Sequence, residues 1–251
     1  MNSQNLFQIF LSEELLEPPE IFQEKSRLFQ RFFPTHAYRC WNRIDLREFI
    51  GDCFPADVLS AYDSLRPLAF KCDLARYCLA YHFGGWYADI SLMLLRGIEL
   101  PEKTELLYFY DLGQTLPSPD KCGHNCMNAF FFASKGSAVM SDAVEMIVRH
   151  CQERFYGMSA LEPTGPTLFG RCIARYAPRP SMIHGHFMSL TPYHMNKNQM
   201  FVSQAGVLLA AFKTSWMGSI GIKGFTDMGT MNIPGSNSYN ELWNAKRVYG
   251  E

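Results

Sequence analysis

The sequence predicts an α/β protein in which helices flank a mostly parallel central sheet. Short apolar segments alternate with longer amphipathic segments through most of the chain, and this alternation is typical of layered α/β folds. Hydrophobic residues make up 47% of the 251 residues, which is enough to fill one substantial core. The sequence contains no internal repeats. We therefore expect a single domain over residues 1–251.

The first elements follow from short apolar runs and helical spacing. Residues 5–11 (NLFQIFL) and 37–41 (AYRCW) are short, apolar and bounded by polar residues, which is typical of buried strands. Between them, residues 21–33 have helical spacing, and Pro34 ends that helix. Residues 44–55 (IDLREFIGDCFP) indicate another short helix.

The strongest helix signal lies at residues 70–83 (FKCDLARYCLAYHF). Gly84 and Gly85 follow it and are suited to a C-terminal cap. The next segment, residues 84–95, is predicted to be a strand. Four residues of the helix follow the i, i+3, i+4, i+7 rule and are expected to face the core: Leu74, Tyr77, Cys78 and Tyr81.

The second half is predicted less fully. We expect strands at residues 106–110 and 128–134, with a proline-bearing polar loop from Asp111 to Asn125 between them. The connection from Asp111 to Met127 is expected to be a mobile loop near the active site that acts as a lid. The glycine-rich last third offers one good strand, residues 207–212, and a helix at 239–249. The segment 137–155, which precedes this last third, is predicted to be a helix. It places six residues on a single face: Val139, Ala143, Met146, Ile147, His150 and Cys151.

Charge and hydropathy exclude several classes of protein. The formal net charge is -1 with a pI near 6.7, and no stripe of basic residues exists, so we expect no nucleic-acid partner. No apolar stretch reaches the roughly 18 residues of a membrane span, and the N-terminus lacks the pattern of a signal peptide. The sequence therefore predicts a cytoplasmic protein, with at most peripheral membrane association at the inner face. Its eight cysteines are expected to be reduced.

Asp73 and Arg76 are three residues apart on the strongest helix, away from its apolar face. One interpretation is a solvated ion pair, which contributes little to stability. The other is a ligand site, in which the carboxylate meets a sugar hydroxyl and the guanidinium meets a phosphate or ribose. The residues alone favour the ion pair.

Asp89 and Ser91 are two apart in a predicted strand, so their side chains are expected on the same side of the sheet. An unpaired carboxylate among residues that favour burial is unfavourable. Asp89 is therefore the least surface-like acid of the chain. It binds a ligand or caps the turn that follows.

Cysteines and histidines recur in two short motifs. Cys122, His124 and Cys126 lack the second Cys or His pair of a closed zinc site, so a loop is favoured over a metal centre. His184 and His186 have no nearby acid and are interpreted as polar loop residues. The chain also lacks the glycine-rich fingerprints of Walker-type NTPases and dinucleotide-binding proteins.

In this order the motifs resemble glycosyltransferase family 32, the DXD-motif sugar-binding-region group that includes yeast mannosyltransferases. The clostridial glucosylating toxins are more distantly similar. FQIFLSE and AYRCWNRIDLREFIGDCFP resemble the first two blocks, and AYDSLRPLAFKCDLARYCLAYHFGGWYADIS resembles the central block, in which an Asp-Arg helix, a double glycine and an acidic strand occur together. NAFFFASKGSAVMSDAVEMI, PTGPTLF and KTSW match later blocks.

The resemblance implies a GT-A (Rossmann-like) fold and transfer of a sugar from a nucleotide-diphosphate sugar, normally with retention. A UDP-sugar is the favoured donor. The acceptor is expected to be a glycan or lipid-linked glycan, as in bacterial surface polysaccharide or lipopolysaccharide synthesis. By motif position, the donor site contains Asp73, Arg76, Asp89, Ser91, Ser215 and Trp216, the catalytic residues include Asp89 and Asn128, and Gly165 and Pro166 shape the acceptor side.

Two departures from the family pattern concern the metal ion. Ser91 stands at the second acidic position of DXD, and Ala210 and Ala211 stand where relatives often have a histidine. Hydroxyl and methyl groups are poor or impossible ligands for Mn²⁺ or Mg²⁺, so the metal at Asp89 is expected to be weakly held or dispensable. Lys213 is then expected to act as a third catalytic residue by supplying part of the missing positive charge. The alternative is that Lys213 is a solvated surface residue and that a divalent ion still binds through Asp89 and the diphosphate. The alternative function is a non-catalytic protein that binds sugar nucleotides.

Overall fold

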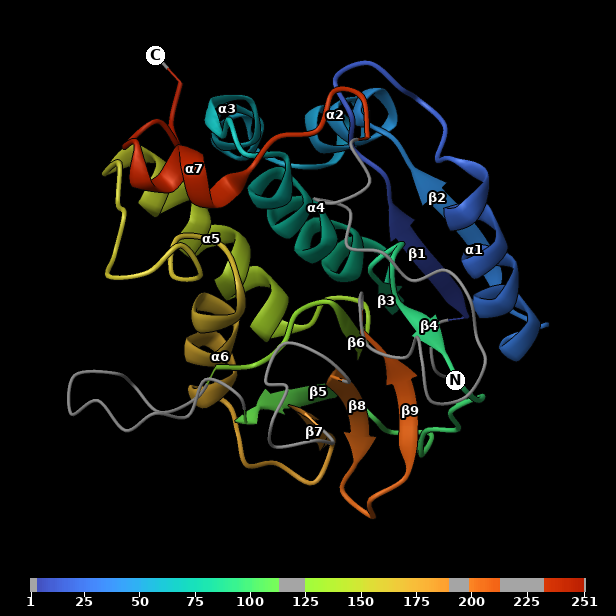
Figure 1. Ribbon diagram of the computed structural model, residues 1–251. Coiled ribbons are helices and arrows are strands. Elements are labelled where there is room, and N and C mark those ends of the chain that lie inside the picture. Colours follow the sequence, from blue (N-terminus) through green and yellow to red (C-terminus); the bar gives the residue numbers. More distant parts are fainter. Residues whose placement is uncertain (1–3, 113–124, 190–198, 213–232, 251) are drawn as a thin grey trace.

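The computed structural model describes residues 4–112, 125–189, 199–212 and 233–250, which form one curled sheet with helices packed around it (Figure 1). The elements in chain order are β1 (Asn5–Ile9), α1 (Glu20–Phe32), β2 (Ala37–Trp41), α2 (Arg43–Cys53), α3 (Ala56–Ser64), α4 (Leu68–Phe83), β3 (Gly85–Ala88), β4 (Met93–Leu94), β5 (Leu106–Asp111), β6 (Phe130–Ala133), α5 (Ala138–Gln152), α6 (Pro166–Ala174), β7 (Met182–Ser189), β8 (Gln199–Ser203), β9 (Leu208–Ala211) and α7 (Tyr239–Asn244).

The nine strands follow the order β2-β1-β3-β6-β5-β7-β8-β9-β4. Three neighbouring pairs are parallel and five are antiparallel, so the prediction of a mostly parallel sheet is wrong. Helices connect the strands of the N-terminal half, which keeps β1 parallel to both of its neighbours. Only residues 204–207 separate β8 from β9, and such a short connection produces antiparallel neighbours. The fold is α/β, with a mixed sheet.

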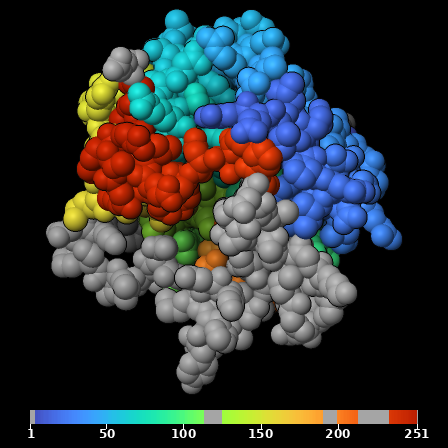
Figure 2. All heavy atoms as spheres, turned by 45° about the horizontal axis from the view of Figure 1, so that its top comes forward, coloured from blue at the N-terminus to red at the C-terminus, as the bar shows by residue number. Residues whose placement is uncertain are grey.

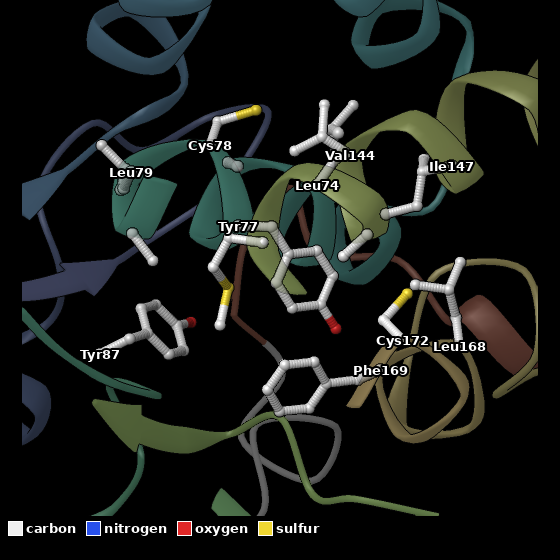
Figure 3. Close-up of a cluster of buried hydrophobic side chains, with 14 of the residues drawn as sticks. Leu74, Tyr77, Cys78, Leu79, Tyr87, Val144, Ile147, Leu168, Phe169 and Cys172 are labelled. Atoms are coloured by element: carbon white, nitrogen blue, oxygen red, sulfur yellow. The ribbon is translucent and has the colours of Figure 1, made fainter. Parts of the chain in front are cut away.

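Two hydrophobic clusters cover the two faces of the sheet. Along β5, Leu106 and Tyr108 belong to one cluster while Leu107 and Phe109 belong to the other, as the alternation of strand side chains requires. The first cluster is covered by α2 to α6, and the second by α1 and β4. Figure 3 shows part of the first cluster, where the ring of Tyr77 stacks on that of Phe169 with 5.4 Å between centroids.

Helix α4 runs through the first cluster and is buried on nearly all sides. Leu74, Tyr77 and Cys78 are buried as predicted, whereas Tyr81 is 37% exposed and the prediction for it is wrong. Tyr81 lies near the C-terminal end of α4, where it lines an open hollow together with Phe54 and residues of α5. The helix ends at Gly84 with φ 66°, which confirms the glycine cap. A Cβ on Gly85 would lie 2.4 Å from the carbonyl oxygen of Asn5, so only glycine permits β1 and β3 to pair there.

The segment 84–95 is not one continuous strand. Strand β3 ends at Ala88, and a turn closed by the Leu92 amide, which donates to the Asp89 carbonyl oxygen at 2.9 Å, separates it from β4. Asp89 and Ser91 therefore do not share a strand face, contrary to prediction. The two-residue β4 pairs with β9 at the opposite edge of the sheet.

The predictions for the other elements differ most from the structure in the last third of the chain. The strands at 5–11, 37–41, 106–110 and 128–134 are confirmed within a few residues, as are the helices at 21–33, 44–55 and 137–155. Residues 207–212 contain β9, and 239–249 contains the shorter α7. Three elements were not predicted there: α6, β7 and β8. In β7, two histidines and a glycine interrupt the apolar pattern, and β8 and α6 are short, so hydrophobic periodicity is weak in all three.

The C-terminal segment lies against the N-terminal half, where Figure 2 shows it crossing one face beside the first residues of the chain. The Ser12 hydroxyl donates to the Pro234 carbonyl oxygen at 2.7 Å. The Asn237 side chain accepts from the Leu68 amide at 3.0 Å, next to the start of α4. Residues distant in sequence thus fix the position of α4.

Two further expectations concern the cysteines and the membrane. Seven cysteines are described, and all seven are free thiols. In the described part of the chain, no helix combines the length and apolar character required to cross a membrane.

Candidate functional site

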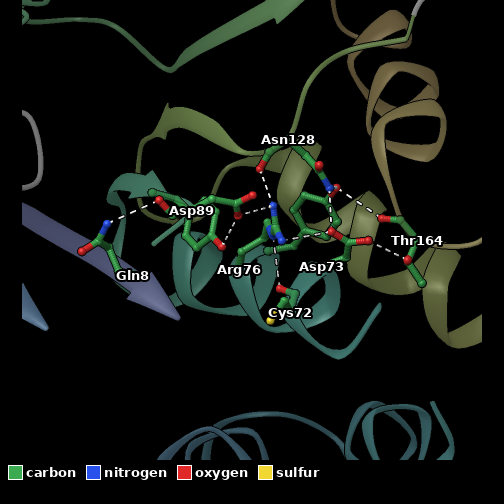
Figure 4. A network of polar contacts seen from close by, with 9 residues as sticks. Gln8, Cys72, Asp73, Arg76, Asp89, Asn128 and Thr164 are labelled. Atoms are coloured by element: carbon green, nitrogen blue, oxygen red, sulfur yellow. Dashed lines mark hydrogen bonds and ion pairs between the residues drawn. The ribbon is translucent and has the colours of Figure 1, made fainter. Parts of the chain in front are cut away.

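A buried polar network centred on Arg76 lies where α4 passes the ends of β3 and β6 (Figure 4). The antiparallel pairing of β3 with β6 brings the end of one strand beside the start of the other, and the Asp89 amide donates to the Ala129 carbonyl oxygen at 2.8 Å. Asn128 precedes β6, and Thr164 precedes α6. The sequence thus brings four distant segments together at one end of the sheet.

Arg76 is 5% exposed and every nitrogen of its guanidinium has an internal partner. Nε donates to the Cys72 carbonyl oxygen at 3.2 Å, and Nη1 donates to the Asn128 carbonyl oxygen at 2.7 Å. The two carboxylates lie on either side, with Nη2 3.2 Å from Asp73 Oδ1 and Nη1 3.2 Å from Asp89 Oδ1. Arg76 therefore positions both carboxylates.

The aromatic ring of Tyr87 completes the surroundings of the guanidinium. The guanidinium carbon of Arg76 lies 4.6 Å from the ring centroid, an arrangement that stabilises the cation through the π face. The Tyr87 hydroxyl donates to Asp89 Oδ1 at 2.8 Å. The residues alone favoured a solvated ion pair of Asp73 and Arg76 on the helix surface. This interpretation is wrong, because the residues around α4 cover this face of the helix as well.

Asp73 is held from three sides. Its Oδ1 accepts from the side-chain amide nitrogen (Nδ2) of Asn128 at 2.9 Å, and its Oδ2 accepts from the Thr164 hydroxyl at 2.7 Å. The same Asn128 nitrogen donates to the Tyr77 hydroxyl at 2.8 Å. With Arg76 on Oδ1 as well, both oxygens of this carboxylate are engaged by protein groups.

Asp89 is the most accessible carboxylate of the network, with 20% of its side chain exposed. Its Oδ1 contacts Arg76 and Tyr87, whereas its Oδ2 has no partner among the described residues. Gln8 of β1 donates to its backbone carbonyl oxygen at 3.5 Å, and Tyr38 of β2 donates to Gln8 at 3.0 Å. Four strands and helices therefore hold Asp89 with one carboxylate oxygen left for a ligand.

Burial and charge act in opposite directions on the ionisable groups. Burial raises the pKa of the Asp73 carboxyl, and the charge of Arg76 together with the bonds from Thr164 and Asn128 counteracts that rise. For Arg76, burial acts to lower the pKa, but the nearby Tyr87, Asp89 and Asp73 raise it well above its ordinary value. Arg76 is thus permanently charged, and it is the counter-charge that makes two carboxylates tolerable here.

The described residues do not supply a ligand set for a hard divalent cation. Ser91 is 1% exposed and its hydroxyl has no hydrogen-bond partner there, and the side chains of Ala210 and Ala211 are buried methyl groups. No group of three or more His, Cys, Asp or Glu residues within the described ranges could hold a metal ion. Mg²⁺ and Mn²⁺ require several oxygen ligands, and Asp89 alone provides one carboxylate already paired with Arg76.

Gly165 and Pro166, predicted on the acceptor side, lie next to the network at the start of α6. A Cβ on Gly165 would lie 3.6 Å from Asp73 Oδ2 and 3.2 Å from the Leu161 carbonyl oxygen, so a side chain would crowd this approach. The Cys126 amide donates to the Pro166 carbonyl oxygen at 3.1 Å, which ties this turn to the segment before β6. Gly165 is thus adjacent to Asp73, and the role of both residues on the acceptor side stays a prediction.

The remaining candidates are placed differently. His184 and His186 lie on β7 near the centre of the sheet, so their interpretation as loop residues is wrong. Cys126 is fully buried, and Asp111 ends β5 in a buried position. Residues 113–124 of the predicted lid, which include Cys122 and His124, lie outside the described residues, as do Lys213, Ser215 and Trp216.

Four residues of the site were not predicted from the sequence: Gln8, Tyr77 as a polar partner, Tyr87 and Thr164. Gln8 carried a detectable signal, because a glutamine inside the apolar run NLFQIFL must find a partner when buried. Tyr87 also precedes Asp89 by two residues. Thr164 had no such signal, since its contact with Asp73 spans 91 positions.

Comparisons with known proteins support the fold. No protein-family model and no curated protein matches this sequence. A solved structure described as "PaToxG Glycosyltransferase" is similar, with a TM-score of 0.52, 13% sequence identity and 70% of each chain covered. The chain therefore has a glycosyltransferase-like α/β fold.

Proposed function

We propose that this chain is a glycosyltransferase that moves a sugar from a nucleotide-diphosphate sugar to a hydroxyl acceptor. The observation that carries the proposal is the Arg76 network, which holds Asp73, Asp89 and Asn128 together at the end of β3 in a glycosyltransferase-like fold. Polar groups at the ends of strands are a common ligand site in open α/β sheets. The sequence resemblance to glycosyltransferase family 32 assigns the same residues to the donor.

In this proposal the roles divide between contact and positioning. Asp89 Oδ2 and the side-chain oxygen of Asn128 are the acceptors available to sugar or ribose hydroxyls. Arg76, with every nitrogen engaged internally, orients both carboxylates and contacts the donor little or not at all. This assignment differs from the resemblance, which places Arg76 directly on ribose or phosphate.

Transfer breaks the bond between the anomeric carbon and the diphosphate oxygen, and it forms a bond from that carbon to an acceptor oxygen. The departing nucleoside diphosphate takes the electron pair and gains negative charge, while the acceptor hydroxyl loses a proton, which the departing diphosphate takes up. Stabilising that developing charge is commonly a large part of catalysis. We assign this task to Lys213, with Ser215 and Trp216 closing over the diphosphate, on sequence grounds alone.

The finer features of the proposal also rest on the resemblance. They are retention of configuration, a UDP-sugar donor, a glycan or lipid-linked glycan acceptor beside Gly165 and Pro166, and a place in bacterial surface polysaccharide or lipopolysaccharide synthesis. A divalent ion at Asp89 is weakly held or dispensable in this account. Activity that persists in EDTA in the parent and falls in Lys213→Ala supports it, and full loss in EDTA with no effect of Lys213→Ala contradicts it.

A second function is favoured by the absence of metal ligands at Ser91, Ala210 and Ala211, which are the positions expected to hold the ion. In that case the protein binds sugar nucleotides without turnover. Thermal shift with a panel of nucleotide sugars, followed by donor hydrolysis with the best ligand, separates the two. A ligand at a hundredfold excess over its Kd adds about 2.7 kcal/mol to the free energy of unfolding. Binding without hydrolysis or transfer identifies the non-catalytic protein.

A further inference from the structure

His184 and His186 form a pair of imidazoles on β7, outside the Arg76 network. The two residues are two positions apart on one strand, so both side chains stand on the same face of the sheet. Their ring centroids are 5.8 Å apart with an interplanar angle of 81°. Both side chains are half-buried.

The distance between the rings is suited to a shared metal ion. A Zn–N bond of about 2.1 Å, with about 1.1 Å from nitrogen to ring centre, puts each centroid about 3.2 Å from a bound ion. Two such rings at a tetrahedral angle are then about 5.2 Å apart, and at a wider angle up to about 6 Å. The observed 5.8 Å lies inside that range without any change of backbone.

The surroundings of the pair favour a ligand as well. Half-buried polar groups normally have hydrogen-bond partners, yet neither imidazole makes a hydrogen bond to any residue in the described ranges. Tyr108 and Tyr110 of β5 stand opposite them in register, and their rings lie 6.1 and 5.3 Å from that of His184. These rings limit the rotation of His184, which keeps it near its neighbour.

We propose that His184 and His186 bind a divalent transition-metal ion of the class that favours imidazole, with Zn²⁺, Ni²⁺ and Cu²⁺ as its members. Imidazole nitrogen suits these ions, whereas Mg²⁺ and Mn²⁺ favour oxygen ligands. Both ligands come from one strand, so the ion joins no separate elements and has no structural role like that of a four-ligand zinc site. Its other coordination positions remain open to water or to an exogenous ligand.

The test uses the full chain after removal of metals with a chelator. Isothermal titration with ZnCl₂ and NiCl₂ measures the affinity of the parent, of His184→Asn and of His186→Asn. We expect one site whose affinity falls at least tenfold in each variant, and no displacement by excess Mg²⁺. His36→Asn is the matched control, because it removes a half-buried histidine elsewhere on the surface. Asp89→Asn is the second control and must keep the same zinc affinity.

The electron paramagnetic resonance spectrum of the parent loaded with one equivalent of Cu²⁺ decides the matter even if a variant fails to fold. Coupling to two imidazole nitrogens supports the site, and coupling to fewer than two overturns it. Absence of zinc and nickel binding in the parent, or equal affinity in the parent and both histidine variants, also overturns it. A fall in zinc affinity in Asp89→Asn instead would place the ion at the proposed donor site. The outcome does not depend on transferase activity.

Discussion

Replacing Arg76 with methionine removes the counter-charge from two buried carboxylates while keeping most of the side-chain volume. Both ion pairs measure 3.2 Å, to Asp73 Oδ1 and to Asp89 Oδ1. At an effective dielectric constant of 20, each attraction is about 5 kcal/mol before desolvation is counted. Removing one partner of a buried pair generally costs about 3–5 kcal/mol, and the partial exposure of Asp89 favours the lower end of that range.

Urea unfolding of four proteins measures this coupling: the parent, Arg76→Met, Asp73→Asn and the double variant. We expect Arg76→Met to lower the free energy of unfolding by about 3–4 kcal/mol. Asparagine retains oxygen for the bond from Thr164 and removes one of the charges that Arg76 balances. The double variant should therefore lose about 1–3 kcal/mol less than the sum of the single variants.

A loss below about 1 kcal/mol in Arg76→Met, or additivity within about 0.5 kcal/mol in the cycle, would refute the role of Arg76 as the buried counter-charge. The same variants bear on donor binding. If Arg76→Lys, which keeps the charge but not the planar fork, binds nucleotide sugars as the parent does, then positioning by several bonds is not required.

Three other predictions each concern a single residue: Thr164, Gly185 and Lys25. Thr164→Val leaves Asp73 Oδ2 without its 2.7 Å donor and should cost about 1–3 kcal/mol in urea unfolding; an unchanged midpoint contradicts this. A Cβ on Gly185 would lie 2.4 Å from a backbone carbonyl oxygen, so Gly185→Ala should cost about 1–3 kcal/mol. In the control Gly51→Ala, the added Cβ on α2 meets only the Leu59 side chain of α3, at 3.5 Å, and stability should rise by about 0.5–1 kcal/mol. Burial lowers the pKa of Lys25 from 10.5 to about 8, so the folded state releases this proton first and the free energy of unfolding should rise between pH 8 and 10.5. Lys25→Met should flatten that rise, and an equal slope in both proteins counts against it.

The sequence predicted the N-terminal half of the fold because its signals are local. The strand at 37–41, the helix that ends at Gly84 and the apolar run of β5 each depend on spacing or on one glycine or proline. Strand β7 lacked such a signal, since its central Gly185 is required by a neighbouring strand that is distant in sequence. Strand direction is likewise decided by connections, and this is why the mixed sheet was not predicted.

The sequence identified part of the candidate site but not the environment of its residues. Asp73, Arg76 and Asp89 were identified from motif spacing, and the structure brings them together with Asn128. Helical periodicity separated an apolar face from a polar face on α4, but β3 and β6 cover the polar face too. Burial of that kind depends on which elements pack together, and a single helix does not encode it.

The most direct test of the central claim is release of free nucleoside diphosphate from a nucleotide sugar by the parent and by Asp89→Asn. Asp89→Asn is nearly isosteric and removes the charge on the carboxylate of the Arg76 network whose Oδ2 has no partner among the described residues. We predict slow hydrolysis of at least one donor, UDP-sugars first, by the parent, and a loss of at least tenfold in kcat/KM in Asp89→Asn with the fold intact by circular dichroism. Equal hydrolysis by the two proteins, or no binding and no hydrolysis of any nucleotide sugar by the parent, would contradict the account.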